Sequence, residues 1–161
     1  MSGLEQRSRN AGHGQTQPTV TVLSSLLAVE DELGYIPKEA LEAVIEAVGG
    51  EVVDFPGKTL CCGFPILTIN PENSVNMVAN HTIDAKDRGA AAMVTPCPLC
   101  HLNLDGYQPN ASSARKREID LPIIHLPQLV GLSLGIEPEK MRLNKHIVST
   151  KKLLSELAVT P

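Results

Sequence analysis

The sequence predicts an α/β domain, with a mainly parallel sheet of about four strands flanked by helices. Two observations lead to this fold class. Short runs rich in β-branched residues alternate with longer stretches of helical periodicity along most of the chain. Cysteine or polar side chains then follow each predicted strand, and parallel sheets bind their ligands at the carboxyl ends of the strands. The sequence therefore places a cysteine site at that edge of the sheet.

The predicted elements follow one another in order. Pro37 suits a first helical turn and Gly49 with Gly50 ends that helix, while Asn70 and Pro71 begin the next long helix and Gly89 ends it. Residues 108–120 are polar and fit either a loop or a continued helix. The predicted strands are 19–23, 51–54, 91–94 and 121–125; the predicted helices are 25–33, 37–48, 70–88, 98–107 and 127–134, with a partly helical tail at 138–157.

Composition narrows the class of protein. The 161 residues carry a formal net charge of −4 and form no basic stretch typical of nucleic-acid binding. No apolar run reaches the ~18 residues of a membrane span. Residues 1–18 lack the apolar core of a secretory signal and are predicted to be a disordered lead-in, leaving 19–161 as a single domain. We expect a cytoplasmic protein, whose reducing surroundings favour a metal or redox role for its thiols.

All four cysteines occur in two pairs, a vicinal Cys61-Cys62 and a CxxC formed by Cys97 and Cys100. CxxC is a frequent half-site for zinc and for iron–sulfur clusters. Adjacent side chains of an extended segment point in opposite directions, so a vicinal pair fits a cluster of several irons better than one zinc ion. The alternatives are a zinc site made by all four thiols, a thioredoxin-like dithiol at the CxxC, and a vicinal disulfide or buried thiols at residues 61–62.

The predicted topology brings the two pairs together, because both follow strands of the same sheet. Pro98 can begin a helix whose positive end favours a thiolate at Cys97. Among the histidines, His101 and His125 are candidates to hydrogen-bond a bound cluster, whereas His81, within a predicted helix, is expected to face solvent or to make a contact at the helix surface. The predicted ligands are thus Cys61, Cys62, Cys97 and Cys100, with His101 and His125 beside them.

Three segments resemble the cysteine-rich CCG domain found in the B subunit of heterodisulfide reductase: KTLCCG at 58–63, TPCPLCHLNLD at 95–105 and IHLPQLVGLSLG at 124–135. The resemblance extends over about residues 41–154 and is to one copy of a domain that occurs twice in that family, the C-terminal half. Each family copy has one cysteine, then CC, then CxxC. The upstream cysteine is absent here, and Ser24 or Ser25 occupies its place.

The resemblance implies an iron–sulfur subunit that transfers electrons or reduces a disulfide within a heterodisulfide-reductase-like oxidoreductase. Its implied partners are ferredoxin-like and flavin-bearing redox subunits, or a second CCG chain, with the aliphatic stretch 121–135 and the cysteine loops covered by the partner. With four thiolates and no fifth, a cubane 4Fe–4S cluster fits better than the noncubane form of the family. The alternative is a non-catalytic assembly module stabilised by zinc or by an inert cluster.

Overall fold

The computed structural model describes residues 30–34 and 37–157, and the chain divides into two compact units, residues 1–44 and 45–161. The helix α3 (Lys38–Ala47) begins in the first unit and ends in the second, and it closes at Gly49, whose φ is +90°. The second unit then contains, in order, η1 (Phe64–Ile66), α4 (Pro71–Asp87), β1 (Met93–Thr95), α5 (Pro98–Gly106), α6 (Gln108–Arg115), β2 (Ile123–His125), α7 (Leu126–Ser133), η2 (Leu143–Lys145) and α8 (Lys151–Glu156).

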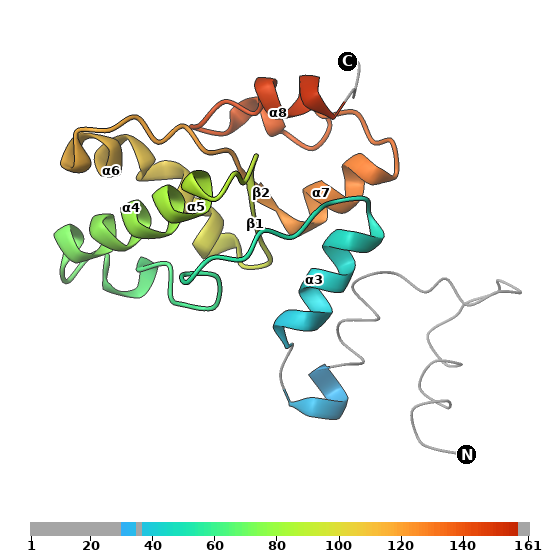
Figure 1. Cartoon of the computed structure of the whole chain (residues 1–161), viewed down its shortest axis with the longest axis horizontal. Helices are drawn as coiled ribbons and strands as arrows, with labels where there is room; N and C mark the ends of the chain where they lie inside the picture. Colours follow the sequence, from blue (N-terminus) through green and yellow to red (C-terminus); the bar gives the residue numbers. More distant parts are fainter. Residues whose placement is uncertain (1–29, 35–36, 158–161) are drawn as a thin grey trace, which may run out of the picture. The chain divides into compact units, whose positions relative to one another are not determined.

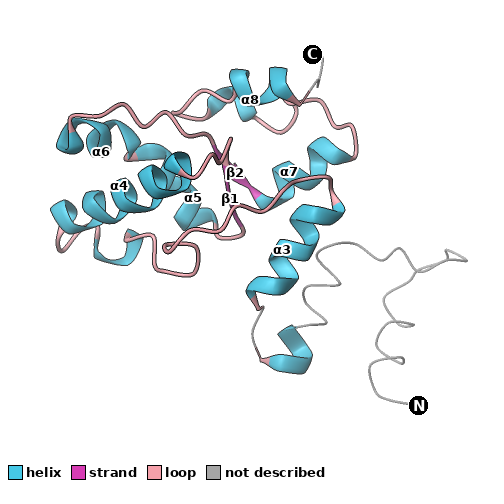
Figure 2. Ribbon diagram, in the orientation of Figure 1, coloured by secondary structure: helices cyan, strands magenta, loops and turns pink. Residues whose placement is uncertain are grey.

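The second unit is mostly helical, which corrects the predicted sheet of about four strands (Figures 1 and 2). Within the described residues the sheet consists of β1 and β2 alone, paired in parallel with Thr95 opposite His125. The predicted strand 51–54 is irregular backbone, and 19–23 lies outside the described residues. The run 51–54 pairs with no strand in the described part of the chain, and a short run becomes a strand only where a neighbour completes its hydrogen bonds.

Local signals place the helices well. The Asn70 side chain accepts a hydrogen bond from the backbone N–H of Asn73 at 3.0 Å, and Pro71 occupies the first turn of α4. Gly89 has a φ of +89° just beyond the last residues of the helix. Of the polar stretch 108–120, which fitted a loop or a helix, the first part forms α6 and residues 116–120 are irregular. These caps and breakers fix the helices that carry the candidate site residues.

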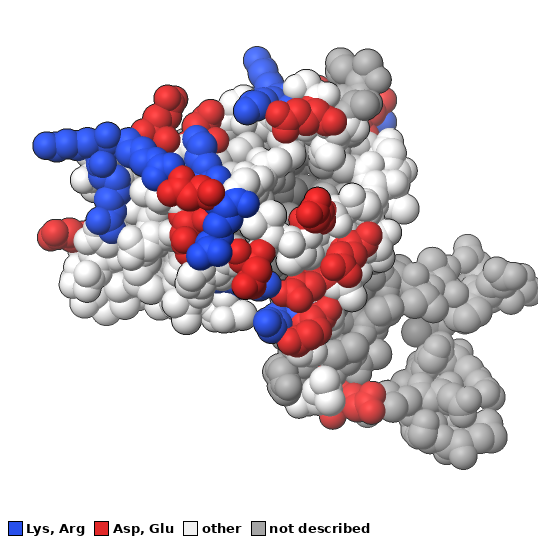
Figure 3. Space-filling model, viewed as in Figure 1, with Lys and Arg blue, Asp and Glu red and all other residues white. Residues whose placement is uncertain are grey.

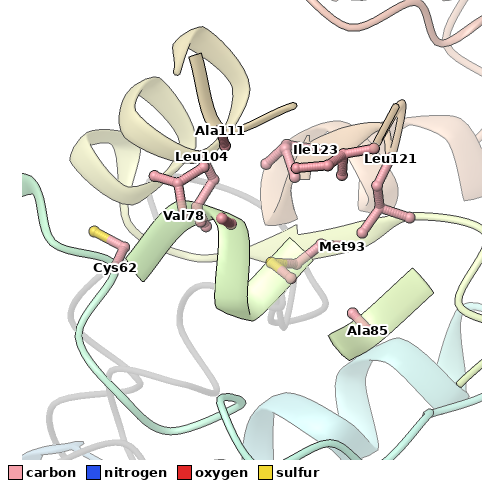
Figure 4. Close-up of a cluster of buried hydrophobic side chains, with 10 residues drawn as sticks. Cys62, Val78, Ala85, Met93, Leu104, Ala111, Leu121 and Ile123 are labelled. Carbon is pink, nitrogen blue, oxygen red and sulfur yellow. The ribbon is translucent and has the colours of Figure 1, made fainter. Parts of the chain in front are cut away.

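The two strands separate two hydrophobic clusters. Side chains of successive residues on a strand point to opposite faces, so Ile123 enters one cluster and Ile124 the other. The helices α4 and α6 run side by side over the first cluster, while α7 and α8 contribute to the second (Figure 1). Cys62 lies at the edge of the first cluster (Figure 4). The buried residues of the first cluster are Cys62, Val78, Ala79, Ala85, Met93, Leu104, Ala111, Ile119, Leu121 and Ile123.

The first part of the aliphatic stretch 121–135 belongs to the chain's own core, so it does not offer a surface to a partner, whereas the end of the stretch is exposed. Leu121, Ile123 and Ile124 are at most 2% exposed, whereas Leu134 near the other end of the stretch is 73% exposed.

On the face shown in Figure 3, Lys and Arg side chains are interspersed with Asp and Glu. Arg117, for example, pairs with Asp87.

Gly63 ends the vicinal cysteine segment in a conformation that other residues rarely adopt, with a φ of +92°. A Cβ at this position would also lie 3.1 Å from Ser74 Cα and 3.2 Å from Met77 Cβ. We therefore expect Gly63→Ala to lower the free energy of unfolding by about 2 kcal/mol or more. Denaturant unfolding of the metal-free reduced protein would measure it.

The matched control is Gly106→Ala. Gly106 is the last residue of α5, and a Cβ there meets nothing within 4 Å. Because alanine is the better helix former, this change should leave the free energy of unfolding unchanged or raise it by up to about 1 kcal/mol. Equal losses of stability in the two variants would contradict the special role of Gly63.

Candidate metal centre

The CxxC lies where β1 passes into α5. Cys97 is the residue that precedes the first turn of α5, and its backbone N–H donates to Thr95 Oγ1 at 3.2 Å. The pKa of the Cys97 thiol is lowered, chiefly because the backbone N–H of Cys100 donates to its sulfur, with a further contribution from the Leu99 N–H. The first turn of a helix favours negative charge in this way. The Cys97 thiol therefore ionises more readily than an ordinary cysteine.

Cys100 behaves in the opposite way. Burial raises the pKa of its thiol strongly, and the neighbouring thiols of Cys62 and Cys97 raise it further. A second or third negative charge at this place is unfavourable unless a cation balances it. All four cysteines are free of disulfides. The fold therefore brings Cys62, Cys97 and Cys100 together as reduced thiols from segments far apart in the sequence.

The vicinal pair presents one buried and one exposed side chain. Cys62 is 5% exposed and belongs to the hydrophobic core, whereas Cys61 is exposed and its sulfur accepts a hydrogen bond from the Gly63 N–H at 3.5 Å. Of these two side chains, only that of Cys62 is withdrawn from solvent.

His81 was expected to face solvent or to make a contact at the helix surface, and the solvent-facing alternative is wrong. The imidazole is 8% exposed and its Nε2 lies 2.9 Å from the Cys61 carbonyl oxygen, to which it donates. The helix α4 turns this face toward the cysteine loop, and a Cβ at Gly57 would lie only 2.1 Å from His81 Nδ1. Nothing in the helical periodicity of residues 70–88 gives the position of that loop, because the contact joins residues 20 apart.

His101 and His125 both lie beside the CxxC. His125 ends β2, and its Nε2 donates to the Pro96 carbonyl oxygen at 3.1 Å. Its ring centroid is 6.0 Å from that of His101. The two rings line an open pocket of about 250 Å³ together with Pro98 and Gln128. Burial lowers the pKa of His101, and the neighbouring His146 and His125 lower it further against the opposing effect of Asp105.

A second group of potential ligands, His101, Asp105 and His146, did not emerge from the sequence. Their ligand atoms lie within 4.8 Å of one another, and each oxygen of the buried Asp105 carboxylate accepts one backbone N–H, from Ile147 at 2.8 Å and from Val148 at 3.0 Å. The four-residue spacing of His101 and Asp105 on one helix is a signal that the sequence offers. The third member comes from 41 residues further on and carries no such signal.

The hydrogen bond from Gln128 to His146 shows why His101, Asp105 and His146 differ from an ordinary metal site. The Gln128 amide nitrogen donates to His146 Nε2 at 3.0 Å, while its amide oxygen accepts the His125 N–H at 2.9 Å. A neutral His146 then carries its own proton on Nδ1. Neither nitrogen of His146 has a free lone pair, so these three residues are one ligand short of a metal site as they stand.

The structure thus places four of the six predicted site residues at the carboxyl edge of the two strands, namely Cys97, Cys100, His101 and His125. Cys61 and Cys62 reach the same region from an irregular segment instead of from the predicted strand at 51–54. Ser24 and Ser25 lie outside the described residues.

Residues 30–105 match the family described as CCG: Cysteine-rich domain. The predicted resemblance to this domain, as it occurs in the B subunit of heterodisulfide reductase, is confirmed. Two such subunits come from Methanosarcina. The chain is 25% identical to the B subunit of the ferredoxin/F(420)H(2)-dependent CoB-CoM heterodisulfide reductase of Methanosarcina acetivorans, over 72% of this chain and 39% of the relative. It is 28% identical, with the same coverage, to the B subunit of the ferredoxin:CoB-CoM heterodisulfide reductase of Methanosarcina mazei.

A further relative is the 8-methylmenaquinol:fumarate reductase membrane anchor subunit of Wolinella succinogenes, 35% identical over 130 residues. The match covers 79% of this chain and 46% of that relative, so the chain spans less than half the length of the proteins it is similar to. Each of these three relatives is named as a subunit of a reductase. Among the described residues, no helix combines the length and the apolar character needed to cross a bilayer.

Proposed function

We propose that this chain is an iron–sulfur subunit of a heterodisulfide-reductase-like redox complex, with Cys61, Cys62, Cys97 and Cys100 holding a 4Fe–4S cluster. The observation that carries the proposal is that Cys62 lies against α5, the helix that follows Cys97 and contains Cys100: Asn103 of α5 donates to the Cys62 carbonyl oxygen at 2.8 Å, and the Cys62 thiol raises the pKa of Cys100. Cys62 and Cys97 each raise the pKa of the Cys100 thiol, so ionising the three thiols together is unfavourable, and a cationic iron–sulfur core would offset that cost. The match to the cysteine-rich family and the reductase subunits among the relatives support the same conclusion.

The four cysteines match a 4Fe–4S cluster both in the type of ligand and in the number of ligands that it needs. A cubane cluster takes one terminal thiolate per iron, and the chain has four cysteines. The pKa of Cys97 is lowered, Cys62 is buried, Cys100 is half-buried, and the exposed Cys61 would supply the fourth thiolate. Backbone N–H groups at the beginning of α5 face the Cys97 sulfur, which also suits an anionic cluster.

In the complex, a bound cluster would supply one-electron transfer, and the pocket beside the CxxC would admit the disulfide to be reduced. Reduction breaks one S–S bond and forms two S–H bonds, which takes two electrons and two protons. The electrons would come from a ferredoxin-like or flavin-bearing partner subunit. His101 and His125 line the pocket and can hold a proton at a ring nitrogen next to such a substrate.

Metal analysis of protein purified without oxygen tests the proposal. We expect about four iron and four sulfide per chain and a broad visible absorption that bleaches on reduction. A colourless protein that contains zinc at one ion per chain would overturn it in favour of a structural module for assembly. Size exclusion of the natively purified material would show whether the chain is held in a larger complex, and a free monomer that reduces disulfides unaided would contradict the proposed dependence on partners.

A further inference from the structure

Two side chains from different helices hold the vicinal cysteines by their backbone. His81 of α4 donates from Nε2 to the Cys61 carbonyl oxygen at 2.9 Å, and Asn103 of α5 donates from Nδ2 to the Cys62 carbonyl oxygen at 2.8 Å. These two consecutive carbonyls lie in an irregular segment, and no backbone N–H of the described residues donates to either of them. A backbone carbonyl so placed needs another donor, and here each has one of its own.

We propose that His81 and Asn103 are positioning residues that set the directions of the two vicinal thiols. Side chains of neighbouring residues diverge in ordinary extended backbone, so two adjacent cysteines serve one site only where their peptides are held in a particular orientation. Fixing both carbonyls fixes the rotation of both peptides. The inference rests on the proposed function for the identity of the group that the thiols hold, and on the hydrogen bonds alone for the orientation of the thiols.

The surroundings of Asn103 support a positioning role. The residue is completely buried, and its amide nitrogen donates both to Cys62 and to the Ser74 hydroxyl at 3.3 Å. Its amide oxygen is buried without a partner among the described residues. A buried polar atom left unpaired is unfavourable, so the two hydrogen bonds of the amide nitrogen have to offset that cost. The amide nitrogen is therefore the atom through which Asn103 can position Cys62, because it donates to the Cys62 carbonyl oxygen.

His81 is held just as tightly. It is 8% exposed, and the backbone of Gly57 packs so close to its ring that a Cβ at that glycine would lie 2.1 Å from Nδ1. The ring is thus fixed between the segment before the cysteines and the Cys61 carbonyl. Because Asn103 lies one helical turn after Cys100 on α5, the same helix carries one cysteine of the CxxC and one holder of the vicinal pair.

The first experiment uses the metal-free, reduced full chain, so it does not depend on the identity of the bound group. The rate at which an alkylating reagent modifies Cys62 is followed by mass spectrometry, with the rate at Cys97 as internal reference. We expect Asn103→Leu to raise the Cys62-to-Cys97 rate ratio about tenfold, because the loop then opens locally without global unfolding. An unchanged ratio would overturn the role of Asn103.

The matched control is Gln108→Leu. Gln108 is another buried amide, 1% exposed, and it bonds the Leu104 and Leu121 carbonyls and the Leu121 N–H, none of which belongs to the cysteine loop. Its loss should lower stability but leave the rate ratio as in the wild type. If Gln108→Leu changes the ratio as much as Asn103→Leu does, the effect is one of general stability and the proposal fails.

His81 offers a pair of variants that keeps the proposal testable even if Asn103→Leu does not fold. His81→Gln retains an N–H donor that reaches the Cys61 carbonyl, whereas His81→Leu does not. We expect the leucine variant to raise the reactivity of Cys61 and Cys62 relative to Cys97, and the glutamine variant to restore the wild-type ratios. Equal ratios in the two variants would contradict a positioning role.

A second measurement applies to protein that carries its cluster. Variants that misdirect a thiolate should shift the reduction potential and the electron paramagnetic resonance spectrum, while Gln108→Leu should leave both in place. If the wild-type chain takes up no cluster at all, the proposed function fails, yet the alkylation ratios still decide whether His81 and Asn103 position the thiols. If a cluster is bound and neither potential nor spectrum moves, the positioning proposal fails and the proposed function stands.

Discussion

Replacing Cys62, Cys97 or Cys100 with serine is expected to remove most of the iron from protein purified without oxygen. Cys62 and Cys97 both influence the Cys100 thiol, and a neutral serine hydroxyl is a poor ligand for iron beside thiolates. Loss of one terminal ligand leaves an iron open to solvent, which destabilises the whole cluster. Iron and sulfide analysis with the visible spectrum of each variant measures the effect. Circular dichroism of the metal-free variants provides the control, because all should keep the helical content of the parent.

Cys61→Ser separates two versions of the site. If Cys61 is the fourth ligand, this variant loses iron as the other three do, although its side chain is exposed in the structure. Wild-type iron content in Cys61→Ser, with loss in the other three, would show a site of three protein thiolates and would remove Cys61 from the proposed ligand set. Wild-type iron content in all four variants would defeat the proposal that these cysteines hold a cluster.

Alkylation of the metal-free, reduced protein near neutral pH is expected to reach Cys97 well before Cys100, by at least about tenfold, because each unit of pKa changes the thiolate fraction tenfold. Helix N–H groups lower the pKa of Cys97, so its thiolate forms at a pH below that of an ordinary cysteine. Burial and two thiol neighbours raise the pKa of Cys100, so its thiolate forms only at a pH above that value. Mass spectrometry of partly alkylated samples resolves the two sites.

The dependence of the two alkylation rates on pH tests the direction of the two pKa shifts. As pH rises, the alkylation rate of Cys97 should increase first, and that of Cys100 should increase only in strongly alkaline solution. In concentrated denaturant the helix and the burial are lost, so the two rates should converge. Equal rates in the native protein, or a faster Cys100, would contradict the placement of Cys97 at the beginning of α5.

Much of the helical part of the fold could be predicted from the sequence because its signals are local. Asn70, Pro71 and Gly89 bound α4 within a residue or two of the expected limits, since capping and breaking depend on neighbours in the chain. The strands depend on distant partners. The run at 51–54 has the same β-branched character as residues 121–125, yet within the described chain only the latter pairs with another strand, β1.

Some features of the candidate site likewise follow from local sequence signals, and others depend on distant contacts. Cysteine spacing is the reason for proposing the four thiols as ligands. The strand ends near Cys97 and His125 were placed correctly because β1 and β2 do pair in parallel. No local pattern indicates that His81 turns inward to Cys61, or that Asn103 reaches Cys62 across 41 positions. Such contacts arise from the packing of α4 and α5 on the cysteine loop, which depends on the tertiary fold.

The hydrogen bonds of Asp105 have a consequence for where this domain can be cut. The family match ends at residue 105, yet the Asp105 carboxylate accepts its two N–H groups from Ile147 and Val148, and β1 pairs with β2 at residues 123–125. A fragment ending at 105 would retain all four cysteines but expose that carboxylate and strip one edge from β1. The boundary that sequence similarity draws is therefore not the boundary of the folding unit, and any separately expressed version should extend through α8.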